Sequence, residues 1–266
     1  MFERLFGGAT TAVREGPRVR GRPARLPDGV RVYAIGDIHG RLDLLRRIEE
    51  LVLEDLAATS QLVSPLIVYL GDYVDRGYRS RETIEELIAN ERLEGIPRVL
   101  LQGNHDLWLA GFARGRSLSA SWLEYGGDAT LLSYGVPLRR DLPEPQRLAE
   151  ASRALAERMP SEHLKFLEEL ELAFSLGDYF FCHAGIHPRV PLHEQRAEDL
   201  LWIREPFLSW SGEASKVVVH GHTVSDAPVV RHNRIGIDTG ACFTGVLTCL
   251  VLEGEDWRFL ATEAEP

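Results

Sequence analysis

Three short motifs put side chains that can bind a metal ion directly after runs of apolar residues. They are "GDIHG" at residues 36–40, "GDYVDRG" at 71–77 and "GNHD" at 103–106. Carboxylate oxygens, amide oxygens and imidazole nitrogens form a mixed ligand set that suits Mn²⁺, iron or Zn²⁺ better than Ca²⁺. A carboxylate such as Asp72 can also bridge two ions, as in two-metal hydrolytic sites. The motifs therefore predict a metal site with ligands enough for two ions.

Histidines follow two later apolar runs in the same way. "FCHAG" places His183 after one run, and "VVVHGHT" places His220 and His222 after another. Taken singly, each motif is more typical of a turn, a helix cap or a hydrogen-bonded histidine than of a ligand. Together they would bury several uncompensated polar groups at strand ends if no ion were bound. The combination favours a metal centre.

The first half of the chain predicts alternating strands and helices that bring these motifs together. Apolar runs at 30–35, 65–70 and 98–102 predict buried strands, and 41–56 has the apolar spacing of an amphipathic helix. Ser80 is a candidate cap for a second helix. This order implies parallel neighbouring strands joined by right-handed crossovers. Because ligands gather beyond the carboxyl ends of such strands, we expect the three motifs to converge.

The second half of the chain predicts more helices and then more strands. Residues 106–170 have helical spacing, and Gly177-Asp178 is a hairpin signal between two strand-like runs. Five or six strands are expected after residue 170. The prediction is an α/β fold with two mixed sheets packed as a sandwich and flanked by helices.

The motifs also carry a resemblance to a known family. "GDIHG", "GDYVDRG" and "GNHD", in this order, resemble the signature of the phosphoprotein phosphatase family of dinuclear metallophosphatases, within the calcineurin-like superfamily. "HAGI", "GHT" and "IDTG" resemble its downstream blocks, so the likeness covers about residues 30–250. Val224 stands where many broader metallophosphoesterases have another ligand histidine, which favours the phosphoprotein phosphatase branch. Within that family, the chain resembles the bacterial branch. The resemblance implies hydrolysis of phosphate esters by a metal-bridging water, without a covalent phosphoenzyme.

Matched position by position, the resemblance implies a role for each polar residue of the motifs. Asp72 bridges the two ions, and the other ligands are Asp37 and His39 for the first ion and Asn104, His183 and His222 for the second. His220 is the alternative to His222, because "HGHT" offers two histidines.

The resemblance also implies the groups that act on the substrate. Asp75 orients His105, which donates a proton to the leaving oxygen as a general acid. Arg76 clamps the phosphoryl oxygens, which its planar guanidinium suits. Arg204 in "LLWIREP" is the candidate for a second clamping arginine, and a surface ion pair with Glu205 is the alternative for this residue.

Two substrate classes remain open. The complete "GDYVDRG" favours a serine/threonine phosphoprotein phosphatase with two divalent ions, Mn²⁺ before iron or Zn²⁺. "GNHDL" and "HAGI" favour the alternative, a hydrolase of dinucleoside polyphosphates of the diadenosine tetraphosphate type. An adenine needs an apolar or aromatic slot. The candidates for it are Trp108, Trp122, Tyr125 and Tyr134, but their helical spacing among leucines predicts core positions, so we expect phosphomonoesters to be preferred.

Charge and composition limit which partners and which cellular compartment are expected. The net charge is −10, but residues 1–25 hold six arginines and two glutamates, a net of +4. We therefore expect a flexible basic arm over 1–28 and a single catalytic domain over 29–266, whose acidic surface would repel nucleic acid. No apolar run reaches the roughly 18–20 residues that span a bilayer, and no secretory signal is evident. Three cysteines without CxxC spacing predict reduced thiols. We expect a cytoplasmic protein without stable membrane association.

Overall fold

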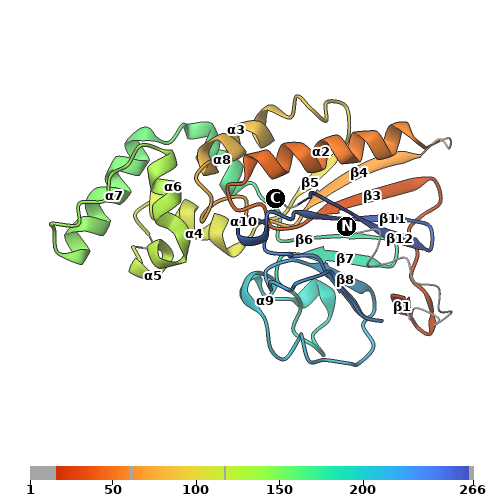
Figure 1. Ribbon diagram of the computed structural model, residues 1–266. Helices are drawn as coiled ribbons and strands as arrows, with labels where there is room; N and C mark the ends of the chain where they lie inside the picture. The colour runs from red at the N-terminus through yellow and green to blue at the C-terminus, as the bar shows by residue number, and fades with distance from the viewer. Residues whose placement is uncertain (1–15, 60–62, 117, 264–266) are drawn as a thin grey trace.

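Two five-stranded sheets form the centre of the protein, which a computed structural model describes over residues 16–59, 63–116 and 118–263 (Figure 1). The first sheet has the order β12-β11-β3-β4-β5, with β3 (Val30–Ile35), β4 (Ser64–Tyr69), β5 (Arg98–Leu100), β11 (Thr248–Glu253) and β12 (Asp256–Ala261). The second has the order β6-β7-β8-β10-β9, with β6 (Ala173–Leu176), β7 (Tyr179–Cys182), β8 (Val217–His220), β9 (Val229–Val230) and β10 (Arg234–Gly236). Both sheets mix parallel and antiparallel pairs, so the predicted fold class is confirmed.

The two sheets pack face to face because their strands are apolar on both sides. In β3, Val32 and Ala34 point into the core between the sheets, where they meet Phe181 and Val219 of the second sheet. Tyr33 and the other odd-numbered positions of β3 point to the opposite face of the first sheet. This alternation, with a period of two residues, is what allows one strand to serve two cores.

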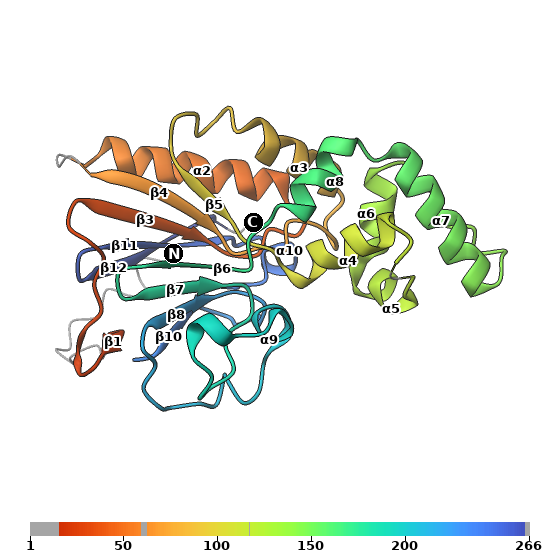
Figure 2. The ribbon, with the colours of Figure 1, turned by 180° about the vertical axis from the view of Figure 1, so that it is seen from behind.

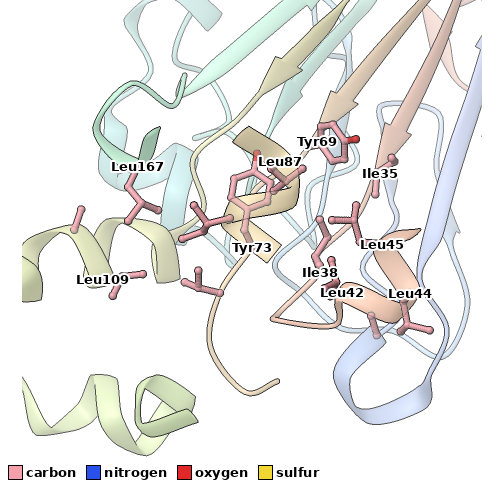
Figure 3. Close-up of a cluster of buried hydrophobic side chains, with 14 of the residues drawn as sticks. Ile35, Ile38, Leu42, Leu44, Leu45, Tyr69, Tyr73, Leu87, Leu109 and Leu167 are labelled. Atoms are coloured by element: carbon pink, nitrogen blue, oxygen red, sulfur yellow. The ribbon is translucent and has the colours of Figure 1, made fainter. Parts of the chain in front are cut away.

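Helices cover the outer face of each sheet (Figures 1 and 2). On the first sheet lie α2 (Leu42–Ala57) and α3 (Ser80–Ala89), and Figure 3 shows Leu42 and Leu45 of α2 near Ile35 and Tyr69 of the strands. On the second sheet, α9 (Ala197–Trp202) and the segment after it cover Phe180 and Val218. The helix predicted over 41–56 is thus α2, with its apolar positions facing the sheet.

The helical middle of the chain extends to one side of the sandwich (Figure 1). It comprises α4 (Asn104–Ala113), α5 (Ala120–Trp122), the π-helical turn η1 (Leu123–Gly127), α6 (Asp128–Ser133), α7 (Glu144–Arg158) and α8 (Ser161–Glu168). Two short helices occur later, η2 (Leu192–Glu194) and α10 (Ala241–Thr244). No helix in the described ranges has the length and apolarity to cross a membrane.

The N-terminal segment differs from its prediction. Residues 1–15 lie outside the described residues, but β1 (Arg18–Val19) and β2 (Arg22–Pro23) form a hairpin against the body. Val19 and Leu26 are buried in the core between the sheets, and Arg22 donates two hydrogen bonds to Asp178, at 2.7 and 3.1 Å. The expectation of a flexible arm is therefore wrong for residues 16–28, because a few apolar side chains among the arginines close the open end of this core.

Ser80 also has a different role from the predicted one. It is the first residue of α3 rather than its cap, and the preceding residue makes no capping hydrogen bond with its side chain. The hydroxyl of Ser80 instead accepts the backbone N–H of Asp75, at 3.0 Å. The helix start thus supports the loop that carries the "DYVDRG" side chains.

Candidate metal centre

Five strands end at one place between the two sheets, and the polar motifs follow their carboxyl ends. β3 leads to Asp37 and His39, and β4 leads to Asp72. α4 begins with Asn104 and His105, four residues after β5 ends. From the second sheet, β7 leads to His183 and β8 leads to His222. The convergence expected from the parallel topology is present.

Two groups of buried side chains share the carboxylate of Asp72. One group joins Asp72 to His39 and His105, and the other joins it to His183 and His222; within each group the candidate ligand atoms lie within 4.8 Å of one another. The Nε2 atoms of His39 and His183 are each 3.5 Å from the same oxygen of Asp72. A carboxylate that lies between two ligand groups has the position of a bridge.

Backbone carbonyl groups orient two of the histidines. Nδ1–H of His39 donates to the carbonyl of Val74 at 2.8 Å, and Nδ1–H of His183 donates to that of Leu70 at 2.9 Å. A carbonyl can only accept, so in the neutral ring the proton is on Nδ1 and the Nε2 lone pair faces Asp72. Burial favours this neutral form, because it lowers the pKa of His39 to about 3 and also lowers that of His183. Such carbonyl partners commonly fix metal-binding histidines.

Several polar atoms of the site lack a compatible partner unless a cation is bound. The Nε2 lone pair of His183 faces the amide oxygen of Asn104 at 2.9 Å, so two acceptors point at each other. Nε2 of His222 is buried without a hydrogen-bond partner. Because buried polar atoms are otherwise nearly always satisfied, this donor set fits a divalent ion.

Buried carboxylates give the same indication. Burial, together with the charges of Asp238 and Asp72, raises the pKa of Asp37 well above its ordinary value. Burial and the charge of Asp72 raise the pKa of Asp238 to about 6. An excess of buried negative charge is what bound cations would offset.

Asp37 is the predicted ligand whose position differs most from the expectation. It belongs to neither of the two Asp72 groups, and its carboxylate accepts the backbone N–H of His222, at 3.1 Å from Oδ2. This contact links the loop after β3 to the loop after β8, across the two sheets. Asp37 is therefore buried outside the two Asp72 groups, next to the candidate ligand His222.

His222 and His220 are separated by the geometry of β8. His220 is the last residue of the strand, on the same face as Val218, and its ring lies against Phe207 with centroids 5.1 Å apart. His222 follows the strand end, and its ring is 5.1 Å from that of His183. The structure thus brings His222 into the ligand group and leaves His220 packed against the segment that follows α9.

The candidate general acid is held by a network that includes the helical insertion. Nδ1–H of His105 donates to Oδ2 of Asp75 at 2.6 Å. The same carboxylate accepts hydrogen bonds from Nε1–H of Trp122 at 2.7 Å and from the hydroxyl of Thr130 at 2.6 Å. Burial disfavours the charged form of His105, but the negative charges of Asp72 and Asp75 and the hydrogen bond to Asp75 have a larger effect and raise its pKa. These contacts favour the protonated form that a general acid requires.

The two arginines lie on different sides of the ligand groups. Nη1–H of Arg76 donates to Nε2 of His39 at 2.8 Å, and Nη2 lies 3.3 Å from Nε2 of His105. The Nε2 atom of His39 has one lone pair, so His39 can bind an ion only after Arg76 gives up this hydrogen bond. Arg204 is exposed just beyond α9, and no ion pair joins it to Glu205 among the described residues. Its charge adds to burial in lowering the pKa of His222, which indicates that it lies near the site.

Backbone strain concentrates at the site. Eight non-glycine residues of the described chain have positive φ, a region that such residues avoid. Five of them belong to the motifs: His39 (48°), Asp72 (53°), Asp75 (72°), Arg76 (67°) and His222 (61°). Such strained backbone conformations persist only where the surrounding structure holds them in place, and they are common at functional sites.

Four supporting residues were not predicted as part of the site. Asp106 accepts the backbone N–H groups of Gly103, Asp72 and Tyr73, at 2.8, 2.8 and 3.0 Å, and so ties the tips of β4 and β5 together. Asp106 and Asp238 stand within the motifs "GNHD" and "IDTG", which could have indicated them. Trp122 and Thr130 lie about 50 residues from Asp75 with no local signal.

Comparison with known proteins identifies the family. The chain matches the calcineurin-like phosphoesterase family over residues 30–242, and it belongs to that family. It is therefore a metallophosphoesterase, a hydrolase of phosphoesters. The family implies divalent metal ions, and the two groups around Asp72 could bind them.

Individual relatives are more distant. The chain is 27% identical over 239 residues to the asymmetrical bis(5'-nucleosyl)-tetraphosphatase PrpE of Bacillus mycoides (strain KBAB4), covering 81% of this chain and 88% of that protein. It is 28% identical over 190 residues to a symmetrical bis(5'-nucleosyl)-tetraphosphatase of Methylococcus capsulatus, of which it covers 51%. A solved structure described as a candidate diadenosine tetraphosphatase has a TM-score of 0.59 and 21% identity, covering 90% of this chain and 99% of that one. This last likeness shows the shared fold.

Proposed function

We propose that this protein hydrolyses dinucleoside polyphosphates of the diadenosine tetraphosphate type. The observation that carries the chemistry is the carboxylate of Asp72 between two buried ligand groups, with His105 in one of them. The choice of substrate is supported by the relatives named as bis(5'-nucleosyl)-tetraphosphatases, one of which matches 81% of the chain. The phosphoprotein substrate expected from "GDYVDRG" becomes the second candidate.

The site would hold two divalent ions. Asp37 and His39 would bind the first and Asn104, His183 and His222 the second, with Asp72 between them, and Mn²⁺ suits these mixed oxygen and nitrogen ligands best. Two such ions, when bound, make a water molecule acidic enough to attack phosphorus and offset the charge of the phosphates. The protein's own part includes orienting His39 and His183 through the carbonyls of Val74 and Leu70.

The remaining residues would act on the substrate directly. His105 would protonate the leaving phosphate oxygen, and Asp75 would keep its ring oriented through the 2.6 Å hydrogen bond. Arg76 would exchange its contact with His39 for the phosphoryl oxygens. Arg204 would approach from the side of α9, where its exposed side chain is free to reach a phosphate.

A direct comparison of two substrates tests this proposal. We expect the kcat/KM of the Mn²⁺-loaded protein for diadenosine tetraphosphate to be at least about tenfold above that for a phosphoserine peptide. Chromatography of the products separates two ADP from ATP plus AMP and so gives the position of cleavage. A preference for the peptide would instead support a protein phosphatase, and activity that survives chelation of metal would refute the two-metal site.

A further inference from the structure

Three aromatic side chains from separate elements gather beside the metal ligands. They are Trp108 of α4, Tyr125 of η1 and Trp202 of α9, and together we call them the aromatic wall. The ring of Trp108 lies 5.9 Å from that of Tyr125, nearly parallel at 20°, and 4.7 Å from that of Trp202. The wall begins at the reacting groups, because Trp108 is 5.3 Å from the ring of His105 and Trp202 is 6.5 Å from that of His222.

The wall is open to solvent, unlike the other aromatic residues of the insertion. Trp122 and Tyr134 are 1% and 3% exposed, and both pack into the core behind α4, as their helical spacing predicted. Trp108 and Trp202 are only half-buried, and Tyr125 is 58% exposed although it stacks on Trp108. A stacked pair with one ring open differs from the single exposed apolar residues of ordinary surfaces.

Tyr125 is also tied to the phosphate clamp through the backbone. Its neighbour Gly126 accepts the backbone N–H of Arg76 at 3.0 Å. A side chain at Gly126 would meet that nitrogen at 2.5 Å, and the φ of Gly126 is 107°, so this close approach requires glycine. The backbone next to Tyr125 is thereby held against the backbone of Arg76.

We propose that the aromatic wall is a nucleobase-binding subsite, with a purine stacked on the open side of Tyr125. This inference rests on the proposed function, since it supplies the base recognition that a dinucleoside polyphosphate needs and a phosphoserine does not. Aromatic rings bind bases by stacking without regard to sequence. In a dinucleoside polyphosphate, the ribose and the phosphate chain link the base to the bond that is cleaved, so the base lies beyond the reacting groups. The aromatic wall runs from the ring of His105 to the open ring of Tyr125, so it offers a stacking surface next to the groups that would act on the phosphate.

The test compares two inhibitors that differ only in the base. AMP and ribose 5-phosphate are each titrated against hydrolysis of p-nitrophenyl phosphate with Mn²⁺, and the ratio of their inhibition constants is determined. In the wild-type protein AMP should bind at least about fivefold more tightly, the lower range for stacking one base on an aromatic ring. The ratio should fall toward one in Tyr125→Ala and persist in Tyr125→Phe, which keeps the ring.

Leu132→Ala is the matched control, because Leu132 is 63% exposed on α6 and lies outside the aromatic wall. Equal inhibition by the two compounds in the wild-type protein would overturn the subsite, as would a ratio that Tyr125→Ala leaves intact. Loss of the ratio in Phe243→Ala but not in Tyr125→Ala would place the base over Phe243, whose ring lies 5.6 Å from the guanidinium of Arg76. The ratio is measured whether or not the protein cleaves diadenosine tetraphosphate, so the two proposals can fail separately.

Discussion

At the scale of single residues, His220 and His222 differ in surroundings although only one residue separates them. His220 packs against Phe207, and burial lowers its pKa to about 4, so it is a neutral core histidine. His222 has a buried Nε2 without a partner beside His183 and Asp72. The sequence motif offered both, and only the turn after β8 distinguishes them.

Alanine substitutions of the two histidines should therefore have opposite effects. His222→Ala should lower the bound metal from two ions per chain toward one and abolish most activity, with little loss of stability in the metal-free protein. His220→Ala should keep both ions and lower the free energy of unfolding by about 1–3 kcal/mol, through the cavity beside Phe207. Elemental analysis of both loaded variants and thermal unfolding of their metal-free forms check this. Retention of two ions by His222→Ala would exclude it as a ligand.

Asp75 accepts hydrogen bonds from His105, Trp122 and Thr130. The bonds from Trp122 and Thr130 hold the carboxylate in place, and the carboxylate in turn orients the general acid His105. Trp122→Phe removes one donor and should lower kcat about 3- to 10-fold on an alkyl phosphate. This is less than the full contribution of about 1.5–3 kcal/mol for a hydrogen bond to a charged group, because His105 and Thr130 still hold the carboxylate. The loss should be smaller for p-nitrophenyl phosphate, whose leaving group needs no proton. An equal loss on both substrates would mean that Trp122 supports only the fold; metal content, measured in parallel, should not change.

At the scale of elements, α2 carries one carboxylate into the core against the first sheet. Glu49 is 4% exposed, and its Oε1 accepts the hydroxyl of Tyr69 at 2.8 Å while Oε2 has no partner. Burial raises the pKa of Glu49 to about 7 from an ordinary value near 4.5. Since the folded-state pKa lies above the unfolded one, this carboxyl contributes its stability below about pH 4.5 and loses it as the pH rises through 7.

Glu49→Gln should remove this pH dependence. We expect the variant to match the wild-type protein near pH 4.5 and to exceed its free energy of unfolding by about 1–3 kcal/mol at pH 8. Urea unfolding at both pH values measures the difference. Glu50→Gln, on the solvent side of α2, is the control that should change little at either pH. A Glu49→Gln variant that is less stable than wild type at pH 8 would contradict the assignment.

How far the sequence predicts these elements depends on the range of the interactions. α2, the parallel strands β3, β4 and β5, and the turn at Gly177-Asp178 follow from apolar periodicity and turn residues, which act locally. The ligand set follows from motifs at strand ends. Trp122 and Thr130 could not be predicted, because their contacts with Asp75 depend on how the insertion folds back. Tyr125 was assigned to the core, because periodicity alone does not tell which side of a short helical turn faces solvent.

At the scale of the whole molecule, the N-terminal hairpin closes the end of the inter-sheet core that lies away from the metal ligands (Figure 2). Leu26 is 1% exposed there, and Leu26→Ala should lower the free energy of unfolding by about 2–5 kcal/mol. The kcat of the folded protein should stay unchanged, since Leu26 contacts no ligand. Arg20→Ala, on the exposed turn of the hairpin, is the control. Unfolding and activity measured on the same preparations test this, and an unchanged stability would restore the flexible arm.

The contributions of the two sheets to the ligand set have a thermodynamic consequence. Of the proposed ligands, Asp37, His39, Asp72 and Asn104 follow strands of the first sheet, whereas His183 and His222 follow strands of the second. An ion held by ligands of both sheets is a cross-link that only the assembled sandwich can form. By mass action, each tenfold rise in free metal above its dissociation constant then adds about 1.4 kcal/mol to the unfolding free energy. The cellular supply of the metal would thus set the lifetime of the protein as well as its rate of catalysis.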